Sequence, residues 1–350
     1  MSARVRHWPR PINVWRYVGA TTSQAFSKRG EVRVSTPTIA VIIPTFNRGE
    51  LVTSAVESAL NQRFSNYEII VVDDGSTDNT RDVLSRFAGA IRYIYQQNRG
   101  VSAARNIGIR AANSEWVAFL DSDDEWDANY LATQIDAVNG DARLSMQTTN
   151  CSFIGREGVR DNYFAFNGSA AAFGNHARIV IRHPFRFIVE HGPWQVGSTI
   201  IRRDAIYRAG LFDERFRLSE DIHLMARVAM HGDFAMLRPE LVRVFRRDEQ
   251  TKSLTEQAKD DPILARQMND LMYHDLEKLK GLRKRDRQSL RRVMSANQRA
   301  IGNLLDAKGN VRSAREYYRR ACFTWPSAAS IGRYALFTMS TAGKNEPRLV

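Results

Sequence analysis

Closely spaced carboxylates mark a point in this sequence where catalytic or binding chemistry is expected. Asp121 and Asp123, in AFLDSDD (118–124), lie two residues apart directly after an apolar run. Mg²⁺ and Mn²⁺ prefer one or two such carboxylates together with phosphate oxygens. The third acid, Asp124, strengthens the case for a cation, because burying acids without a counter-charge is costly. The spacing therefore indicates a site for a divalent cation and its ligand, with a solvated acidic turn as the alternative.

Two further acidic motifs carry weaker signals when each is taken alone. In IIVVDDGSTDNT (69–80), Asp74 follows a second apolar run and is placed to accept hydrogen bonds from a nucleobase or ribose. In the alternative, the motif is structural and Ser76 or Thr77 is a cap for the next helix. In RLSEDIHLMARVAMHG (217–232), Glu220 and Asp221 stand at the expected start of a helix, where acids complement the helix dipole in any case. A functional Asp221 would be a general base facing a site at the end of a sheet.

These motifs lie within an alternation of strand and helix patterns. Short apolar runs predict strands at 39–44, 68–72, 91–95 and 116–120, and helical spacing predicts helices at 51–60, 78–87 and 101–112. Strands separated in this way indicate βαβ units and a mostly parallel sheet of an α/β fold. Ligands of such sheets bind beyond the carboxyl ends of the strands, where this sequence concentrates its Asp, Asn, Ser and Gly.

From about Thr255 onward the pattern is helical. The segment NLLDAKGNVRSAREYYRRACFTWP (303–326) has small and aromatic residues at helix–turn–helix positions and resembles one tetratricopeptide-type unit. A single unit cannot bury its own apolar face. We therefore expect it to pack on the body of the protein, on another copy or on a membrane, and a homodimer through this region is one of those arrangements.

The positive charge is concentrated at two places in the chain. The sequence of 350 residues has 51 Lys and Arg against 38 Asp and Glu, a formal charge of +13. Residues 1–35 and 276–320 carry this excess, so the centre is close to neutral. A nucleic-acid enzyme would more often be basic over its active region, so we expect no nucleic-acid partner. Clustered Lys and Arg can instead hold a protein on an anionic membrane, at roughly 1 kcal/mol per residue; a solvated face and a loose tail are the alternative.

The apolar runs and the cysteines bear on location. The longest apolar stretches, such as 38–44 and 115–120, are far shorter than the roughly 20 residues that span a bilayer. We expect no secretory leader, because residues 1–35 contain Trp and Arg but no apolar core of the kind that a leader has. Cys151 and Cys322 are too far apart for a CxxC site. The expected location is the cytoplasm, with peripheral attachment to the inner face of the cell membrane through the basic segments.

Taken in order, the motifs resemble those of the family 2 glycosyltransferases, which have the GT-A fold. The resemblance covers about residues 37–255 and rests on PTFNR (44–48), VVDDGSTDNT (71–80), QNRGVSAARNIGI (97–109), LDSDD (120–124), RRDAIYRAGLFDERF (202–216) and SED (219–221). It implies a metal-dependent, inverting transfer of a sugar from a nucleotide-diphospho-sugar, most simply a UDP-sugar, to a glycan or lipid-linked hydroxyl in cell-surface polysaccharide biosynthesis. The QxxRW signature of processive synthases is absent, which favours addition of a single sugar.

The resemblance also implies roles for individual residues. Nucleotide-sugar binding falls to Pro44, Thr45, Asn47, Asp74, Arg105, Asp121 and Arg246; metal binding to Asp123 and Asp121; catalysis to Asp221, as the base, and Glu220; and acceptor binding to Trp194 and Gln195. The alternative for Asn47 is a cap for the helix that follows, and the alternative for Trp194 is a packed core side chain.

Two positions depart from the family pattern. Many relatives have an acidic residue two positions after the Glu–Asp pair, where this chain has His223. The main expectation is that His223 is a helix-surface or packing residue, and contact with the acceptor is the alternative. Relatives also often have a histidine after the last core strand, where this chain has Arg246 and Arg247. We expect one of these arginines to close over the diphosphate, with a solvated loop as the alternative.

The sequence thus predicts a basic arm (1–36), a GT-A transferase domain (37–255) and a basic α-helical extension (256–350). A second functional hypothesis is a non-catalytic sugar-nucleotide or glycan-binding relative that acts as a scaffold through its helical tail. Two complete acidic pairs, Asp121 with Asp123 and Glu220 with Asp221, argue against this hypothesis. A module that only binds a ligand does not need both a metal-binding pair and a catalytic pair.

Overall fold

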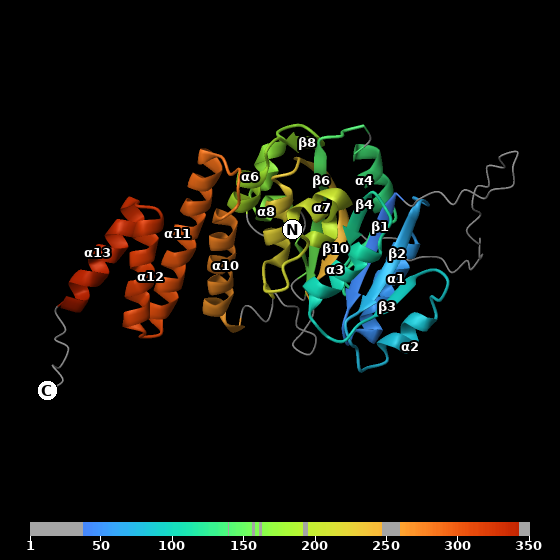
Figure 1. The fold of residues 1–350 in the computed structure, drawn as a ribbon, viewed down its shortest axis with the longest axis horizontal. Helices are drawn as coiled ribbons and strands as arrows, with labels where there is room; N and C mark the ends of the chain where they lie inside the picture. Colours follow the sequence, from blue (N-terminus) through green and yellow to red (C-terminus); the bar gives the residue numbers. More distant parts are fainter. Residues whose placement is uncertain are drawn as a thin grey trace, which may run out of the picture. The chain divides into compact units, whose positions relative to one another are not determined.

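The computed structural model describes residues 38–138, 140–155, 158–160, 163–191, 195–246 and 260–342. Its strands are β1 (Ile39–Thr45), β2 (Tyr67–Asp73), β3 (Arg92–Tyr95), β4 (Trp116–Phe119), β5 (Glu125–Trp126), β6 (Leu144–Gly155), β7 (Gly158–Arg160), β8 (Arg178–Ile181), β9 (Thr199–Arg202) and β10 (Asp233–Phe245). These strands form one sheet in the order β3-β2-β1-β4-β9-β6-β10-β5, with β7 beside β6 and β8 beside β10 (Figure 1).

Helices cover the sheet and continue beyond it. They are α1 (Gly49–Leu60), α2 (Thr80–Ser85), α3 (Val101–Ala111), α4 (Tyr130–Val138), α5 (Tyr163–Phe166), α6 (Phe185–His191), α7 (Arg203–Ala209), α8 (Glu220–Val228), α10 (Pro262–Glu277), α11 (Lys284–Ala307), α12 (Val311–Thr324) and α13 (Ala328–Ala342). The four strands and three helices that the sequence predicts between residues 39 and 112 and at 116–120 are all present, with ends that differ by a few residues. The predicted α/β class is therefore confirmed.

The first half of the sheet is parallel, and its central strands β1 and β4 are buried along their whole length. Strand β1 lies between β2 and β4 and is parallel to both, and β3 extends the set. Alternate residues of β1 point to opposite faces. Val41 and Ile43 join the larger core with Val52 of α1, whereas Ala40 packs in a separate core with Ala104 of α3. Helices on both faces explain why these strands are continuous apolar runs.

The second half of the sheet has mixed directions. Strand β9 is antiparallel to both β4 and β6, and β10 is parallel to β6. Strand β10 also pairs antiparallel with β5, which follows directly on the acidic turn after β4. The end of β10 is thereby brought beside Asp124, whose carboxylate accepts a hydrogen bond from Phe245 N at 3.0 Å. This contact joins the acidic turn to the last strand of the sheet.

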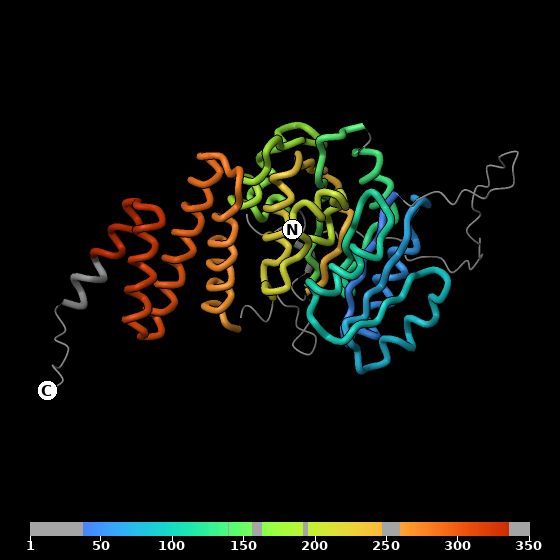
Figure 2. The backbone as a smooth tube through the Cα atoms, viewed as in Figure 1, coloured from blue at the N-terminus to red at the C-terminus, as the bar shows by residue number. Residues whose placement is uncertain are grey.

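Helices α10 to α13 follow one another in sequence order, as the backbone tube shows (Figure 2). The helical pattern predicted for this region is confirmed. The predicted helix–turn–helix is formed by α11 and α12, which pack Ile301 and Leu305 against Ala314 and Tyr318. Gly302 is required there, because an added Cβ would lie 2.6 Å from the Tyr318 ring. Helix α10 also contacts α8, and α11 contacts α6, so the unit packs on the body of the protein.

No helix among the described residues is both long enough and apolar enough to cross a membrane.

Candidate active site

The loop after β1 is held by hydrogen bonds to the loop after β2. Asn47 has a positive φ of 50° and bridges the two loops: its N–H donates to Ser76 Oγ at 2.9 Å, and its Oδ1 accepts from Thr77 N at 2.8 Å. The N-cap position of α1 is occupied by Arg48. The alternative that Asn47 caps this helix is therefore wrong. Thr45 is buried, and its Oγ1 has no hydrogen-bond partner among the described residues. A buried hydroxyl without a partner at a strand end is suited to a ligand.

Asp74 organises the loop before α3. It is 3% exposed, and its carboxylate accepts hydrogen bonds from Arg99 N at 2.9 Å, from Gly100 N at 2.7 Å and from Gln96 Nε2. A carboxylate has about four acceptor positions, so little capacity remains for a ligand. A nucleotide bound at Asp74, as the sequence predicts, would thus compete with these internal hydrogen bonds for the oxygens of the carboxylate.

The glycine after Asp74 is required by the backbone. Gly75 has a φ of +86°, and an added Cβ would lie 2.7 Å from Asn98 N. Both the left-handed conformation and the close approach exclude a side chain here. The tight turn brings the β2–α2 loop and the β3–α3 loop together at the carboxyl end of the sheet.

Arg105 links the acidic turn after β4 to the start of α8. It lies on α3 and is 3% exposed; its Nη2 donates to Asp121 Oδ1 and its Nη1 to Glu220 Oε1, both at 2.8 Å. The guanidinium also lies 5.3 Å from the centroid of the Phe212 ring. Burial alone would lower the pKa of Arg105, but the two carboxylates raise it above its ordinary value. The end of β4 and the start of α8, about 100 residues apart in sequence, therefore share one buried cation.

Asp123 has an arginine partner of its own. Arg48 Nη1 donates to Asp123 Oδ2 at 2.9 Å. Burial, with the charge of Asp121, raises the pKa of Asp123, and Arg48 partly opposes this. The next residue, Asp124, is more deeply buried, and burial together with the charges of Asp123 and Asp121 raises its pKa well above the ordinary range. Three acids thus crowd one turn.

This acidic turn fits the divalent cation expected from the sequence. Asp121 and Asp123 both reach the carboxyl end of β4 and are partly exposed, at 32% and 17% of their side chains. Carboxylate oxygens that repel one another at a strand end suit a hard cation and phosphate oxygens. Asp124 is 4% exposed and already bonded to β10, so it serves the structure of the turn.

Asp221 lies in the first turn of α8, next to Glu220. Burial, and secondly the charge of Glu220, raises the pKa of Asp221 to about 7, while Arg105 opposes this. Its Oδ1 accepts a hydrogen bond from Ile222 N at 2.8 Å, and the side chain keeps some solvent exposure. A carboxylate whose pKa lies near neutrality is suited to remove a proton at physiological pH.

The remaining predicted site residues are less well placed by the structure. Arg246 follows β10; its guanidinium stacks 4.6 Å from the centroid of the Phe153 ring, and its N–H donates to Ile154 O at 2.7 Å. Gln195 begins the turn before β9, where its carbonyl accepts a hydrogen bond from Ser198 N at 3.1 Å. Trp194 and Arg247 lie outside the described residues.

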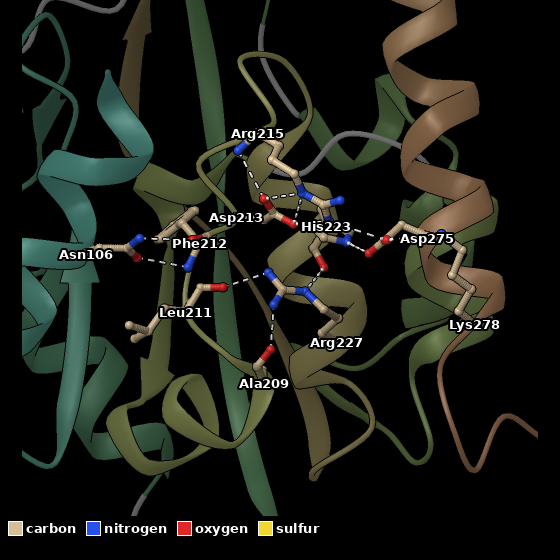
Figure 3. A network of polar contacts seen from close by, with 10 residues as sticks. All are labelled: Asn106, Ala209, Leu211, Phe212, Asp213, Arg215, His223, Arg227, Asp275 and Lys278. Carbon is tan, nitrogen blue, oxygen red and sulfur yellow. Dashed lines mark hydrogen bonds and ion pairs between the residues drawn. The ribbon is translucent and has the colours of Figure 1, made fainter. Parts of the chain in front are cut away.

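A second acidic cluster lies apart from the Asp121–Asp123 turn. Asp213, His223 and Asp275 place their ligand atoms within 4.8 Å of one another, close enough for a metal ion. Arg215 already bonds to the carboxylates of both acids, at 3.0 Å to Asp213 Oδ1 and 3.4 Å to Asp275 Oδ1 (Figure 3). Desolvation and the nearby Arg227 lower the pKa of His223 to about 4. We therefore interpret this cluster as an ion-pair network, which also meets the expectation that His223 packs on its helix.

The sequence analysis missed Arg48 and the second partner of Arg105. Arg48 stands inside the PTFNR motif, so a basic side chain next to an acidic strand end could have been noted. Nothing in the sequence marks Glu220 as a partner of Arg105, because the two residues are far apart in the chain.

Comparison with known proteins identifies the fold and the family. The sequence profile of Glycosyl transferase family 2 matches residues 40–216. A glycosyltransferase of Rickettsia bellii is 29% identical over 215 residues, which cover 61% of this chain and 29% of the relative. A Bacillus subtilis glycosyltransferase named for teichuronic acid biosynthesis, TuaG, is 38% identical over 127 residues, 35% of this chain and 50% of the relative. The matches thus span only part of these relatives.

Solved structures show the same fold. S. aureus TarS 1–349 in complex with UDP-GlcNAc has a TM-score of 0.61 and 17% identity, covering 89% of this chain and 93% of that one. The mannosyltransferase PcManGT from Pyrobaculum calidifontis, in complex with GDP-Man and Mn²⁺, has a TM-score of 0.55 and 18% identity, covering 89% and 82%. These likenesses confirm the GT-A architecture expected from the motifs. Because the profile covers half of the chain and the motifs lie together at the carboxyl end of the sheet, this protein belongs to glycosyl transferase family 2.

Proposed function

We propose that this protein transfers one sugar from a nucleotide-diphospho-sugar to a hydroxyl of a glycan or lipid-linked acceptor, with inversion at the anomeric carbon, in the biosynthesis of a surface polysaccharide. One observation carries the proposal: Arg105 bonds both to Asp121, at the expected donor side, and to Glu220, beside the expected base. A pure binding module would need only the donor side. The non-catalytic scaffold remains the second hypothesis, tested by the same experiments.

On the donor side, the chain offers contacts from three strand ends. Thr45 Oγ1, which has no hydrogen-bond partner in the part of the chain that the structure describes, faces the nucleotide. The loop of Asn47 flanks the nucleotide, and Asp74 contributes through the loop that it orders. Asp121 and Asp123 would hold a divalent cation, which when bound supplies positive charge against the departing diphosphate. A UDP-sugar is the donor we expect, and the TarS neighbour bound to UDP-GlcNAc supports it.

On the acceptor side, Asp221 removes the proton of the attacking hydroxyl. The acceptor gains nucleophilicity as this proton leaves, and Asp221 acts from the face opposite the leaving group. Single displacement from that face inverts the anomeric centre and forms no covalent glycosyl–enzyme. Glu220 keeps the base in place through its bond to Arg105. Gln195 is the residue we propose for acceptor contact, together with Trp194, which lies outside the described residues.

A thermal-shift panel tests the donor assignment. We expect one nucleoside diphosphate, UDP in the first instance, to raise the melting temperature in Mn²⁺ or Mg²⁺ and to lose this effect in EDTA. The Asp123→Ala variant should lose the metal-dependent part of the shift. The exposed Asp82, on α2, provides a matched control, because Asp82→Ala removes an acid that is not among the proposed donor contacts. A full shift in EDTA would contradict metal dependence.

Turnover should rise with pH through about 7. The pKa of Asp221 is raised to about 7, so the base is protonated and inactive below that pH and ionised above it. The Glu220→Gln variant removes a negative neighbour, which should lower this pKa and move the acidic limb of the kcat profile to lower pH. A limb that stays in place in Glu220→Gln would show that another group controls it.

We further propose the organisation that the sequence suggested: a transferase domain over 37–255 and a helical extension over 256–350. The basic stretch 276–320 lies on α10 to α12 and exposes Arg283, Lys284 and Arg285. These side chains favour attachment to anionic lipid, to which residues 1–36, outside the described residues, would add. Sedimentation with vesicles rich in phosphatidylglycerol should decrease when the three residues are replaced by Gln, and equal sedimentation would exclude this surface.

A further inference from the structure

The residue that precedes the catalytic pair has a strained backbone. Ser219 has a φ of +61° and lies directly before Glu220 and Asp221. A residue other than glycine is strained in this left-handed region, so neighbouring structure must hold it there. The direction in which α8 starts, and hence the place of the Asp221 carboxylate, depends on that support.

The support comes from α10, in the helical part of the chain. Ser219 Oγ donates to Asn269 Oδ1 at 2.5 Å. One turn further along α8, His223 Nε2 lies 3.1 Å from Asp275 Oδ2. His223 is 1% exposed, and its ring centroid lies 4.4 Å from that of Phe216. Two residues of α10 therefore hold the first two turns of α8.

The rest of α8 is tied to the loop that precedes it. Arg227 donates to the backbone carbonyls of Ala209 and Leu211, at 2.5 and 2.6 Å (Figure 3). Asn106 of α3 bonds on both sides of Phe212, accepting from its N–H at 2.9 Å and donating to its carbonyl at 2.9 Å. The body thus fixes the end of α8, the loop and, through the bond from Arg105, the side chain of Glu220. Helix α10 adds the contacts to Ser219 and His223.

A second helix of the extension anchors the same region. Ser289 of α11 donates to Glu190 of α6 at 2.5 Å, and α6 packs against α8. Helices α10 and α11 are packed together, so they approach α8 as one unit.

We propose that α10 is a positioning element for the catalytic pair, with Asn269 and Asp275 as its positioning residues. The inference rests on the proposed role of Asp221 as the base. It assigns to the helical extension a part in the transfer step itself, in addition to any part in attachment. Loss of either contact leaves the start of α8 free to relax from its strained backbone and displaces Asp221 from the acceptor hydroxyl. The donor contacts at β1, β2 and β4 are not affected.

The test separates kcat from donor binding. With UDP-GlcNAc and Mn²⁺ as the probe, or the donor found in the thermal-shift panel, kcat is measured as release of the nucleoside diphosphate. In Asn269→Leu we expect kcat to fall about 10- to 100-fold, as small displacements of a catalytic group do. The Kd for UDP with Mn²⁺ should stay within about twofold, since the donor contacts do not involve α10.

Two variants of the same helix are controls. Asn269→Asp keeps the accepting oxygen and should recover most of the lost kcat. Leu271→Gln changes a residue of α10 that is 50% exposed and should leave kcat unchanged. If Asn269→Leu is poorly folded, Ser219→Ala gives the same test, because alanine keeps the strained positive φ but lacks the hydroxyl. We expect the same loss of kcat from it.

The outcomes distinguish this inference from the proposed function. If Asp221→Asn loses turnover while both Asn269→Leu and Ser219→Ala keep it, the positioning role is excluded and Asp221 remains the proposed base. If kcat and UDP binding fall together in Asn269→Leu, α10 supports only the fold, which also overturns the inference. If Asp221→Asn itself keeps turnover, the proposed role of Asp221 as the base is wrong, and the positioning role that rests on it is overturned as well.

Discussion

The Asp221→Asn variant is expected to lose about 10²–10⁴-fold in kcat, the usual contribution of a general base. Asparagine has nearly the same shape and keeps the oxygen that accepts from Ile222 N, so the start of α8 should persist. It cannot take a proton from the acceptor. The nucleotide contacts lie on other elements, so metal-dependent binding of the nucleotide should remain.

The measurement compares kcat with nucleotide affinity in the same preparations. Release of the nucleoside diphosphate reports kcat, and titration calorimetry with UDP and Mn²⁺ reports binding. Asp82→Asn, which changes an exposed acid on α2, should behave as the unmodified protein in both assays. Near-normal turnover in Asp221→Asn would show that another group is the base.

The Arg105→Met variant is expected to lower the free energy of unfolding by about 3–5 kcal/mol, the usual cost of removing one partner of a buried ion pair. Methionine fills similar space but leaves Asp121 and Glu220 without their shared cation. The carboxylate of Glu220, whose side chain is 11% exposed, would then be left nearly buried without its cationic partner. Donor turnover should fall as well, because the two halves of the site lose their common link.

Urea unfolding measures this loss, and Arg110→Met is its matched control. Arg110 lies on the same helix but is exposed, so its replacement should change stability by less than about 0.5 kcal/mol. Adding Glu220→Gln to Arg105→Met should restore part of the stability, since one unpaired charge is removed. Equal stability of the Arg105→Met and Arg110→Met variants would show that the Arg105 bridge contributes nothing to folding.

The order of motifs in the sequence was sufficient for the fold of the first half of the chain. Apolar runs such as the one before Pro44 have the length and composition of strands buried between helices, and each is followed by a turn with its own chemistry. Parallel strands place their carboxyl ends at one edge. Asp121 and the loop of Asn47 were therefore predictable as neighbours of one ligand site.

The sequence alone also determined that the C-terminal part is helical. The period of small and aromatic residues between Leu304 and Pro326 predicted a helix–turn–helix, and α11 and α12 have that form. What their unit packs against was left open among the body, another copy and a membrane. The apolar face of a helix shows that a partner exists but does not identify it.

Only the tertiary structure decided which charges meet. Arg105 is paired with Glu220 across more than 100 residues, Arg48 with Asp123 across 75, and His223 with Asp275 across 52. Local propensity and periodicity act over a few turns of chain, whereas these pairs are set by how α3, α8 and α10 pack at the edge of the sheet. The sequence by itself thus determined the family, the fold class and the residue types of the site. The packing of the helices determined the partner of each charge, because the energy of an ionic contact depends on the distance between the two charges in space and not on their separation in the sequence.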